Sequence, residues 1–379
     1  YGEESDDEEE EEGEEQEEEE KEKERSKSTL PPIPTSISST RDGPIYVVER
    51  VIDRRASGIK LLLARAATPE APDSICFTMC EPRVVIKMVP RVPQTKGHKK
   101  YNFNVQHEIA AMQLTADTPG VVDMIEYAKD DHYTYIVMSY LSGGDLFSRV
   151  EDTCGLDEDT VRGYFKSIVS TLMMMQQQCG LAHHDISLDN IMLDASGAVH
   201  LIDLGMSIKM PGEKPGEVAT ALTTPHLYGG KSSYIAPELA RMRSVVDVYA
   251  ADVWSLGVCL YNMLTAAPLY EQPLDSTFRT METRGGMKSI LKVDEVQYGR
   301  RFSPQAKKLL CWMLDPKPRR RPTFEQILNH PFVTNEGKSD GKLDVTAVAD
   351  ASFSFFSRFA SCVSTLAQDL FAVSEYPSQ

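Results

Sequence analysis

A short run near the middle of the chain carries the side chains whose types and spacing say most about chemistry. Asp185 and Asn190 stand five residues apart, and Asp203 follows in an Ile-Asp-Leu-Gly sequence thirteen residues after Asn190. A carboxylate can orient an attacking hydroxyl group and accept its proton, while an amide oxygen and a second carboxylate are hard ligands that suit Mg²⁺. Phosphoryl transfer requires such a set of groups.

Other motifs surround this run in a definite order. A Val-Val-Ile run ends at Lys87, and a helical pattern that contains Glu108 begins after it. An apolar run over residues 136–141 precedes a Gly-Gly-Asp-Leu sequence that contains Asp145. The later motifs are Ala236-Pro237-Glu238, Asp252-Val253-Trp254-Ser255-Leu256-Gly257 and Arg321-Pro322.

In this order the motifs resemble those of eukaryotic protein kinases, over about residues 45 to 333. The resemblance implies an α+β, bilobal protein-kinase fold, with a β-rich small lobe and an α-helical large lobe. It implies transfer of the ATP γ-phosphate to protein hydroxyl groups, which we expect to be those of serine or threonine. The alternative is a pseudokinase that serves as a binding or scaffold module. The expected parts are a disordered acidic tail (1–44), a small lobe with its hinge (45–141), a large lobe (142–333) and a C-terminal helical extension (334–379).

The resemblance also assigns a role to individual residues. Lys87 is expected to contact the α- and β-phosphates of ATP and to pair with Glu108. The expected catalytic residues are Asp185, Lys87, Glu108, Asn190 and Asp203, of which Asn190 and Asp203 would bind Mg²⁺. The expected ATP-binding residues are Lys87, Met138, Ser139, Leu141, Asp145, Met192 and Gly58. For Asp145 a second interpretation is open, that of a cap at the start of a helix.

The turn after the first expected strand departs from the family pattern. Kinases carry Gly-x-Gly-x-x-Gly here, because glycine lets the backbone approach the nucleotide phosphates closely. Only the third glycine, Gly58, is present, and Asp53 and Arg55 occupy the first two positions. In this the chain is similar to the with-no-Gly-loop kinases of apicomplexan parasites, which are relatives of the rhoptry kinases, and to the FIKK kinases as a second candidate. The first resemblance implies secretion into the parasite vacuole or a secretory granule, and membrane-associated substrates there.

Three further departures concern the catalytic loop and the segment that faces it. His184 stands where an Arg normally receives an activation-loop phosphate, so we expect activity without phosphate on the threonines within residues 220–224. Ser187 stands where Ser/Thr kinases carry a Lys, and Lys231 stands where they carry a Thr. Lys231 is therefore expected either to supply the missing ammonium group or to point to solvent or to an acidic substrate residue.

Two of the later motifs are expected to serve the scaffold. Glu238 should form an ion pair with Arg321, and Asp252 should hold the backbone of the catalytic loop. Both expectations come from the family resemblance and concern the large lobe.

The net charge of −17 is concentrated at one end of the chain. Residues 1–30 hold 17 acidic and 4 basic side chains, which leaves 40 acidic and 36 basic side chains for the rest. The rest is therefore nearly neutral and lacks the basic excess of nucleic-acid-binding proteins, so we expect no nucleic-acid partner. Protein substrates are what the kinase resemblance implies. The glutamate run cannot bury enough apolar surface to fold, which predicts a solvated tail. Docking of a basic partner or Ca²⁺ is the other interpretation.

An apolar pattern recurs near the C-terminus. Phe355, Phe359, Val363, Leu366 and Leu370 are spaced by three and four, which predicts one apolar helix face. Packing on the large lobe is one interpretation, and association with a membrane surface or membrane protein is the other. A single basic residue in this stretch weighs against membrane contact by the helix alone. For the chain as a whole we expect no membrane-spanning helix, a soluble protein and no obligate oligomer. The N-terminal residues, which start at Tyr1, show no secretory signal.

The seven cysteines do not form a Cys-x-x-Cys pair of the kind that binds zinc. A bridge between Cys76 and Cys80 is conceivable in an oxidising compartment, but reduced thiols are the simpler interpretation. Cys259 and Cys311 lie within apolar runs and are expected in the core.

Overall fold

The computed structural model describes residues 34, 36–38, 44–54, 58–69, 77–91, 105–210, 230–241 and 246–335. The chain divides into two compact units, one from residues 1–98 and 128–135, the other from residues 99–127 and 136–379. The glutamate run, the threonines within 220–224, the side chains of Cys76 and Cys80 and the apolar pattern after residue 344 lie outside the described residues. No helix in the described ranges is long and apolar enough to cross a membrane.

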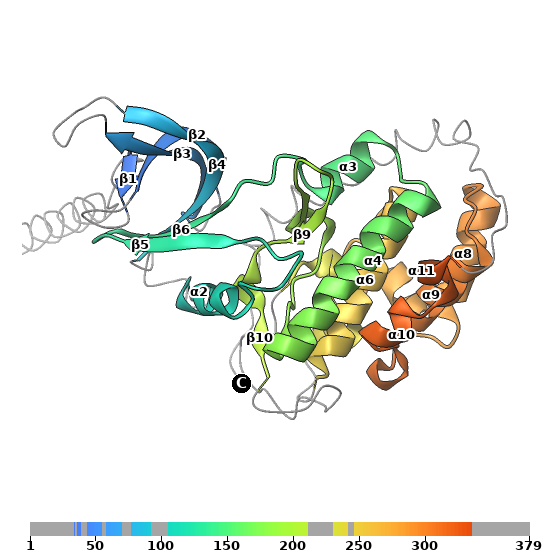
Figure 1. Ribbon diagram of the computed structural model, residues 1–379. Helices are drawn as coiled ribbons and strands as arrows, with labels where there is room; N and C mark the ends of the chain where they lie inside the picture. The colour runs from blue at the N-terminus through green and yellow to red at the C-terminus, as the bar shows by residue number, and fades with distance from the viewer. Residues whose placement is uncertain are drawn as a thin grey trace, which may run out of the picture. The chain divides into compact units, whose positions relative to one another are not determined.

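The first unit is built on an antiparallel β-sheet (Figure 1). The sheet has the order β1-β2-β3-β4-β6-β5. Its strands are β1 (Ser36–Ser38), β2 (Ile45–Arg54), β3 (Lys60–Pro69), β4 (Phe77–Pro90), β5 (Met124–Lys129) and β6 (Tyr133–Ser139), and the last two include residues that are assigned to the second unit. Residues 62–64 of β3 and 86–89 of β4 are buried in succession, so the middle of these two strands is covered on both faces.

Two details of this sheet differ from the sequence expectation. Strand β1 pairs with β2 and buries Ile37, so the sheet begins before residue 45, within the segment expected to be a disordered tail. The pairing is possible because Ile37 alternates with serines and adds one apolar side chain to the covered face. Strand β4 also continues past Lys87 to Pro90, and the Lys87 side chain is buried.

The turn between β2 and β3 is only partly the loop that the sequence predicted. Gly58 has a φ of 82°, a left-handed conformation that glycine adopts without steric cost. Asp53, at the first expected glycine position, is instead paired with Leu61 in the antiparallel ladder. The strand therefore extends through a position at which the family pattern has a loop glycine.

The second unit is mainly helical and surrounds one large apolar core. Its helices are α2 (Val105–Leu114), α3 (Leu146–Asp152), α4 (Glu158–Met174), α5 (Pro237–Ala240), α6 (Val248–Thr265), α7 (Ser276–Met281), α8 (Gly286–Gln297), α9 (Pro304–Met313), α10 (Phe324–Leu328) and α11 (Pro331–Thr334). Two short antiparallel pairs join β7 (Leu181–Ala182) to β10 (Ile208–Lys209) and β8 (Ile191–Leu193) to β9 (Val199–Leu201). Cys259 is buried as expected, whereas Cys311 is only partly buried.

Helices α4 and α6 lie side by side at the centre of this unit (Figure 1). Asp157 caps α4 by accepting the N–H groups of Asp159 and Thr160, and the buried positions of the helix recur every three or four residues. Helix α6 is apolar on nearly all sides and is buried accordingly, with Asp247 as its cap. These two helices provide the support from which the loops of the site extend.

A buried ion pair ties the start of α5 to the segment before α10. Arg321 donates two hydrogen bonds to the carboxylate of Glu238, at 2.6 and 2.8 Å, as the sequence predicted. It also donates to the Ala250 carbonyl oxygen, and its guanidinium group lies 4.9 Å from the ring centroid of Trp254. Both charged side chains are almost completely buried, so each depends on the other for compensation of its charge.

Arg321→Ala should lower the free energy of unfolding by about 3–5 kcal/mol, because it leaves the Glu238 carboxylate buried without its cation. Urea denaturation followed by circular dichroism measures this loss. Arg241 offers a matched control, since it forms the same two-bond pair with Glu282 but is 49% exposed. Arg241→Ala should have a far smaller effect, because water screens exposed pairs. Equal losses for the two variants would contradict the importance assigned to the buried pair.

Candidate active site

The catalytic loop, residues 183–190, is held at its beginning by a side chain of α6. The two carboxylate oxygens of Asp252 accept the backbone N–H groups of His183 and His184, each at 2.8 Å. Burial raises the pKa of Asp252 to about 7, while the two N–H bonds favour its charged form. His184 has a φ of 63°, which is unfavourable for a residue with a Cβ, so these bonds hold a conformation that the loop would otherwise leave.

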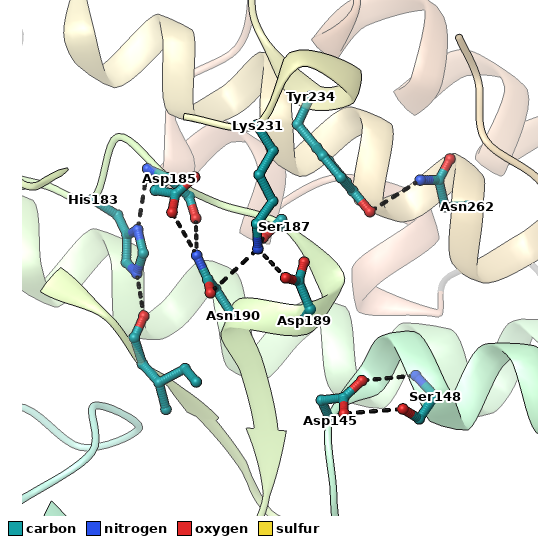
Figure 2. A network of polar contacts seen from close by, with 11 residues as sticks. Asp145, Ser148, His183, Asp185, Ser187, Asp189, Asn190, Lys231, Tyr234 and Asn262 are labelled. Carbon is teal, nitrogen blue, oxygen red and sulfur yellow. Dashed lines mark hydrogen bonds and ion pairs between the residues drawn. The ribbon is translucent and has the colours of Figure 1, made fainter. Parts of the chain in front are cut away.

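Asp185 is positioned by one of its carboxylate oxygens. The Asn190 side-chain amide donates to Asp185 Oδ2 and to the Asp185 carbonyl oxygen, both at 2.8 Å (Figure 2). Asp185 Oδ1 is buried and has no hydrogen-bond partner among the described residues. Burial raises the pKa of Asp185 to about 6, and the charge of Lys231 opposes that rise. One oxygen is thus held by a hydrogen bond while the other has no such partner among the described residues.

His183 connects this loop to the segment that carries Asp203. Its Nε2 lies 3.1 Å from the Ile202 carbonyl oxygen, and its Nδ1 lies 3.3 Å from the Asp185 backbone nitrogen. Burial lowers the pKa of His183 to about 4, so the ring is neutral. The neutral ring with its proton on Nε2 satisfies both contacts, since Nε2 then donates and Nδ1 accepts.

Asn190 and Asp203 come from adjacent backbone segments. The Ile202 N–H donates to the Asn190 carbonyl oxygen at 3.0 Å, which places Asp203 one residue from that bond. Asp203 has a φ of 61° and directly precedes a short 3₁₀ turn, η3 (Leu204–Met206). The two expected metal ligands are therefore neighbours within the second unit.

Lys231 turns toward the catalytic loop. Its Nζ donates to Ser187 Oγ at 3.0 Å and to the Asp189 carboxylate, and it lies 3.5 Å from Asn190 Oδ1 (Figure 2). Of the two interpretations that the sequence left open, the structure shows the one in which this amine occupies the space beside Ser187. Asp189 was not predicted from the sequence as a partner of Lys231. Its acidic side chain lies two residues after Ser187, the position where the family has a lysine, and this could have indicated the pairing.

The segment that carries Lys231 approaches the loop closely because Gly230 has no side chain. Gly230 has a φ of 98°, and a Cβ there would lie 3.2 Å from the His184 carbonyl oxygen. The following turn, η5 (Ser232–Tyr234), is held by α6 and by the chain after it. Ser255 donates to the Tyr234 carbonyl oxygen, and the Tyr270 hydroxyl donates to that of Ile235, both at 2.8 Å.

Helix α2 carries Glu108, which is buried within the second unit. His107 Nε2 lies 2.5 Å from the Ser207 carbonyl oxygen and so fastens α2 to the segment after Asp203. Met112 and Leu204 belong to the same apolar core. Lys87 is described within the first unit, and its pairing with Glu108 stays a prediction.

The expected nucleotide-binding residues are placed on several elements. Met138 and Ser139 end β6, and Leu141 is buried just beyond it. Asp145 caps α3, because its carboxylate accepts the N–H of Ser148 at 2.7 Å and the Ser148 hydroxyl at 3.0 Å (Figure 2). A β-bridge joins Asp145 to Met192. The cap interpretation is thus seen directly, while contacts of these residues and of Gly58 with a nucleotide stay predictions.

Comparison with known proteins agrees with this geometry. The sequence profile of the protein kinase domain matches residues 78–333. The chain belongs to the protein kinase family. It has the α+β fold of that family, with a curled sheet and a helical unit, each described here by itself.

Several curated kinases are similar to this chain. Serine/threonine-protein kinase CHK1 of Saccharomyces cerevisiae is 27% identical over 256 residues, which cover 66% of this chain and 46% of that protein. CBL-interacting protein kinase 31 of Oryza sativa is 32% identical, covering 60% of this chain and 47% of that protein. Calcium-dependent protein kinase 14 of Arabidopsis thaliana is 29% identical, covering 67% and 45%. The chain spans about half the length of the curated relatives it matches.

The pKa of Asp185 leads to a test of the kinase by pH. As the expected base, Asp185 would act in its ionised form, so kcat/KM should fall as the pH falls through about 6, approaching tenfold per pH unit below it. A pH–rate profile at constant ionic strength measures this limb, and unfolding curves at each pH control for loss of the fold. An Asp with its ordinary value of 3.8 would leave the rate flat to about pH 5, which would contradict the effect of burial.

Proposed function

We propose that this protein transfers the γ-phosphoryl group of ATP to hydroxyl groups of protein substrates, with serine and threonine as acceptors. The observation that carries the proposal is the arrangement of Asp185. One carboxylate oxygen is held by Asn190, the other is buried and has no partner among the described residues, and the loop itself is held by Asp252. A base with one fixed oxygen and one oxygen that has no hydrogen-bond partner can orient a hydroxyl group for in-line attack.

Mg²⁺ is the metal that this proposal requires, and the residues present fit it. Asn190 and Asp203 offer an amide oxygen and a carboxylate, which are hard donors, from segments joined by the hydrogen bond between Ile202 and Asn190. When bound, the ion would neutralise charge on the phosphate oxygens. The amide nitrogen of Asn190 bonds Asp185, so its oxygen is the atom directed away from the base.

Positioning and charge supply most of the catalysis in phosphoryl transfer. Asp185 Oδ1 would accept a hydrogen bond from the substrate hydroxyl group and take its proton late in the transfer. The fixed oxygen, Oδ2, keeps the carboxylate from rotating, which preserves the alignment that the reaction needs. Serine and threonine are proposed as acceptors because relatives with 27% and 31% identity carry the name serine/threonine-protein kinase.

A pseudokinase that binds without transfer is the second candidate. It is favoured by Asp53, which lies in the strand ladder where the family has a loop glycine, and by Ser187, which stands where the family has a lysine. Against it stands the complete set of Lys87, Glu108, Asp185, Asn190 and Asp203, since loss of transfer in this fold is usually accompanied by loss of one of them. We therefore favour the enzyme.

Membership of the with-no-Gly-loop group, and with it secretion into a vacuole or granule, is a proposal that rests on the turn sequence alone. The relatives named above come from yeast and plants. Association with membranes or membrane proteins is likewise a proposal. A proximity-labelling experiment that identifies the proteins near this one in the cell would test the location directly.

Asp185→Ser and Asp203→Ala should abolish transfer of labelled phosphate from ATP to a generic basic protein. The first variant removes the base and the second removes a metal ligand, so turnover should fall to background while the fold persists. Asp159→Ser is the control, because that side chain is an exposed carboxylate at the start of α4. Wild-type turnover in both variants would exclude the enzyme, and nucleotide binding without any wild-type turnover would identify a pseudokinase.

The glycine-poor turn should lower the affinity of the protein for ATP. We expect a KM for ATP in the upper part of the usual range of about 1 μM to 1 mM. Substitution of glycine for Asp53 and Arg55 together should lower that KM, because the backbone could approach the phosphates more closely. A variant with unchanged KM would show that the turn does not cover the phosphates, and a sharp rise would show that Arg55 itself binds them.

A further inference from the structure

Two positions of the site have exchanged their residue types relative to the family pattern. The catalytic-loop position that normally holds a lysine holds Ser187, and the facing position that normally holds a threonine holds Lys231. The structure brings the two side chains together, with Lys231 Nζ 3.0 Å from Ser187 Oγ. The loop therefore has an ammonium group beside the position where the family has one, supplied from another segment of the chain.

The surroundings of this ammonium group show where its charge acts. Its acceptors, Ser187, Asp189 and Asn190, all belong to the catalytic loop (Figure 2). Asn190 in turn donates to Asp185, so one side chain separates Lys231 from the base. The charge of Lys231 also lowers the pKa of Asp185, against the larger effect of burial. This positive charge therefore lies beside the residues that the proposed reaction would use.

The backbone of Lys231 is fixed, which limits where the amine can go. Gly230 lets its segment lie against the His184 carbonyl oxygen, and Ser255 and Tyr270 hold the turn that follows. The Lys231 side chain is about one-third exposed, so it borders solvent. Its longest contact, 3.5 Å to Asn190 Oδ1, is the one most readily exchanged for a phosphoryl oxygen.

We propose that Lys231 is a catalytic residue, whose ammonium group stabilises the phosphoryl group during transfer in place of the lysine absent at position 187. This rests on the proposed kinase activity. Negative charge must be accommodated on the oxygens of the transferred group, and a cation fixed beforehand stabilises it without reorganisation during the reaction. The competing role is structural, in which the ion pair with Asp189 does no more than fasten residues 230–234 to the loop.

Kinetics on three variants separate these roles. Lys231→Met keeps the apolar stem and removes the charge, and Lys231→Thr restores the family residue. Both should lower kcat about 100-fold, the size of effect seen when one fixed donor is removed from a charge-stabilising site. The double variant Lys231→Thr with Ser187→Lys rebuilds the family arrangement and should recover at least about tenfold of that loss.

Lys307→Met is the matched control. Lys307 belongs to the same unit, is 37% exposed against 32% for Lys231, and likewise pairs with a carboxylate, that of Glu295. Its substitution should leave kcat unchanged. Thermal unfolding of all variants measures the structural role, and we expect Lys231→Met to shift the midpoint no more than Lys307→Met does.

The outcomes are distinct. An active wild type together with a Lys231→Met variant of unchanged kcat overturns the role of Lys231 and leaves the proposed function standing. A double variant no faster than Lys231→Thr also overturns it, as does a loss of kcat that follows only the fraction of unfolded protein. An inactive wild type that still binds ATP overturns the proposed function and the role of Lys231 with it.

Discussion

The arrangement of the expected catalytic residues depends on one buried carboxylate. Asp252 accepts two backbone N–H groups of the catalytic loop, and these bonds hold His184 in a left-handed conformation that a residue with a Cβ would otherwise avoid. The peptide that follows His184 sets the direction of Asp185. Asp252, whose two carboxylate oxygens accept backbone N–H groups, therefore determines where Asp185 points, and through His183 it also influences the distance from Asp185 to the Asp203 segment.

Helix α6 holds two segments of the site, the catalytic loop and the turn after Lys231. Asp252 and Ser255 are three residues apart, so they lie on the same face of the helix. Asp252 holds the catalytic loop, and Ser255 holds the turn after Lys231 through the Tyr234 carbonyl oxygen. One rigid helix fixes both segments. The relative position of the two backbones therefore does not depend on the hydrogen bond between Lys231 and Ser187.

Much of this could be predicted from the sequence, because the order of the motifs and the periodicity of apolar residues are local signals. The pair of Glu238 with Arg321 and the role of Asp252 followed from the family resemblance that the motifs carry. Strand β1 could not be predicted, since three residues carry no periodicity and their pairing depends on β2. The direction of Lys231 could not be predicted either, because a lysine has four rotatable side-chain bonds and only its neighbours in space select among them. The nucleotide contacts remain predictions.

Because Lys231 contacts Ser187, the residue that is suitable at one of these positions depends on the residue at the other, although they are 44 residues apart in sequence. A lysine at both would place two ammonium groups side by side, and like charges so close disfavour each other's ionisation. A small hydroxyl residue at both would leave the carboxylates of the loop without this cation. Each single exchange therefore creates a mismatched pair, so a chimera that takes only one of the two segments from another kinase would inherit the mismatch.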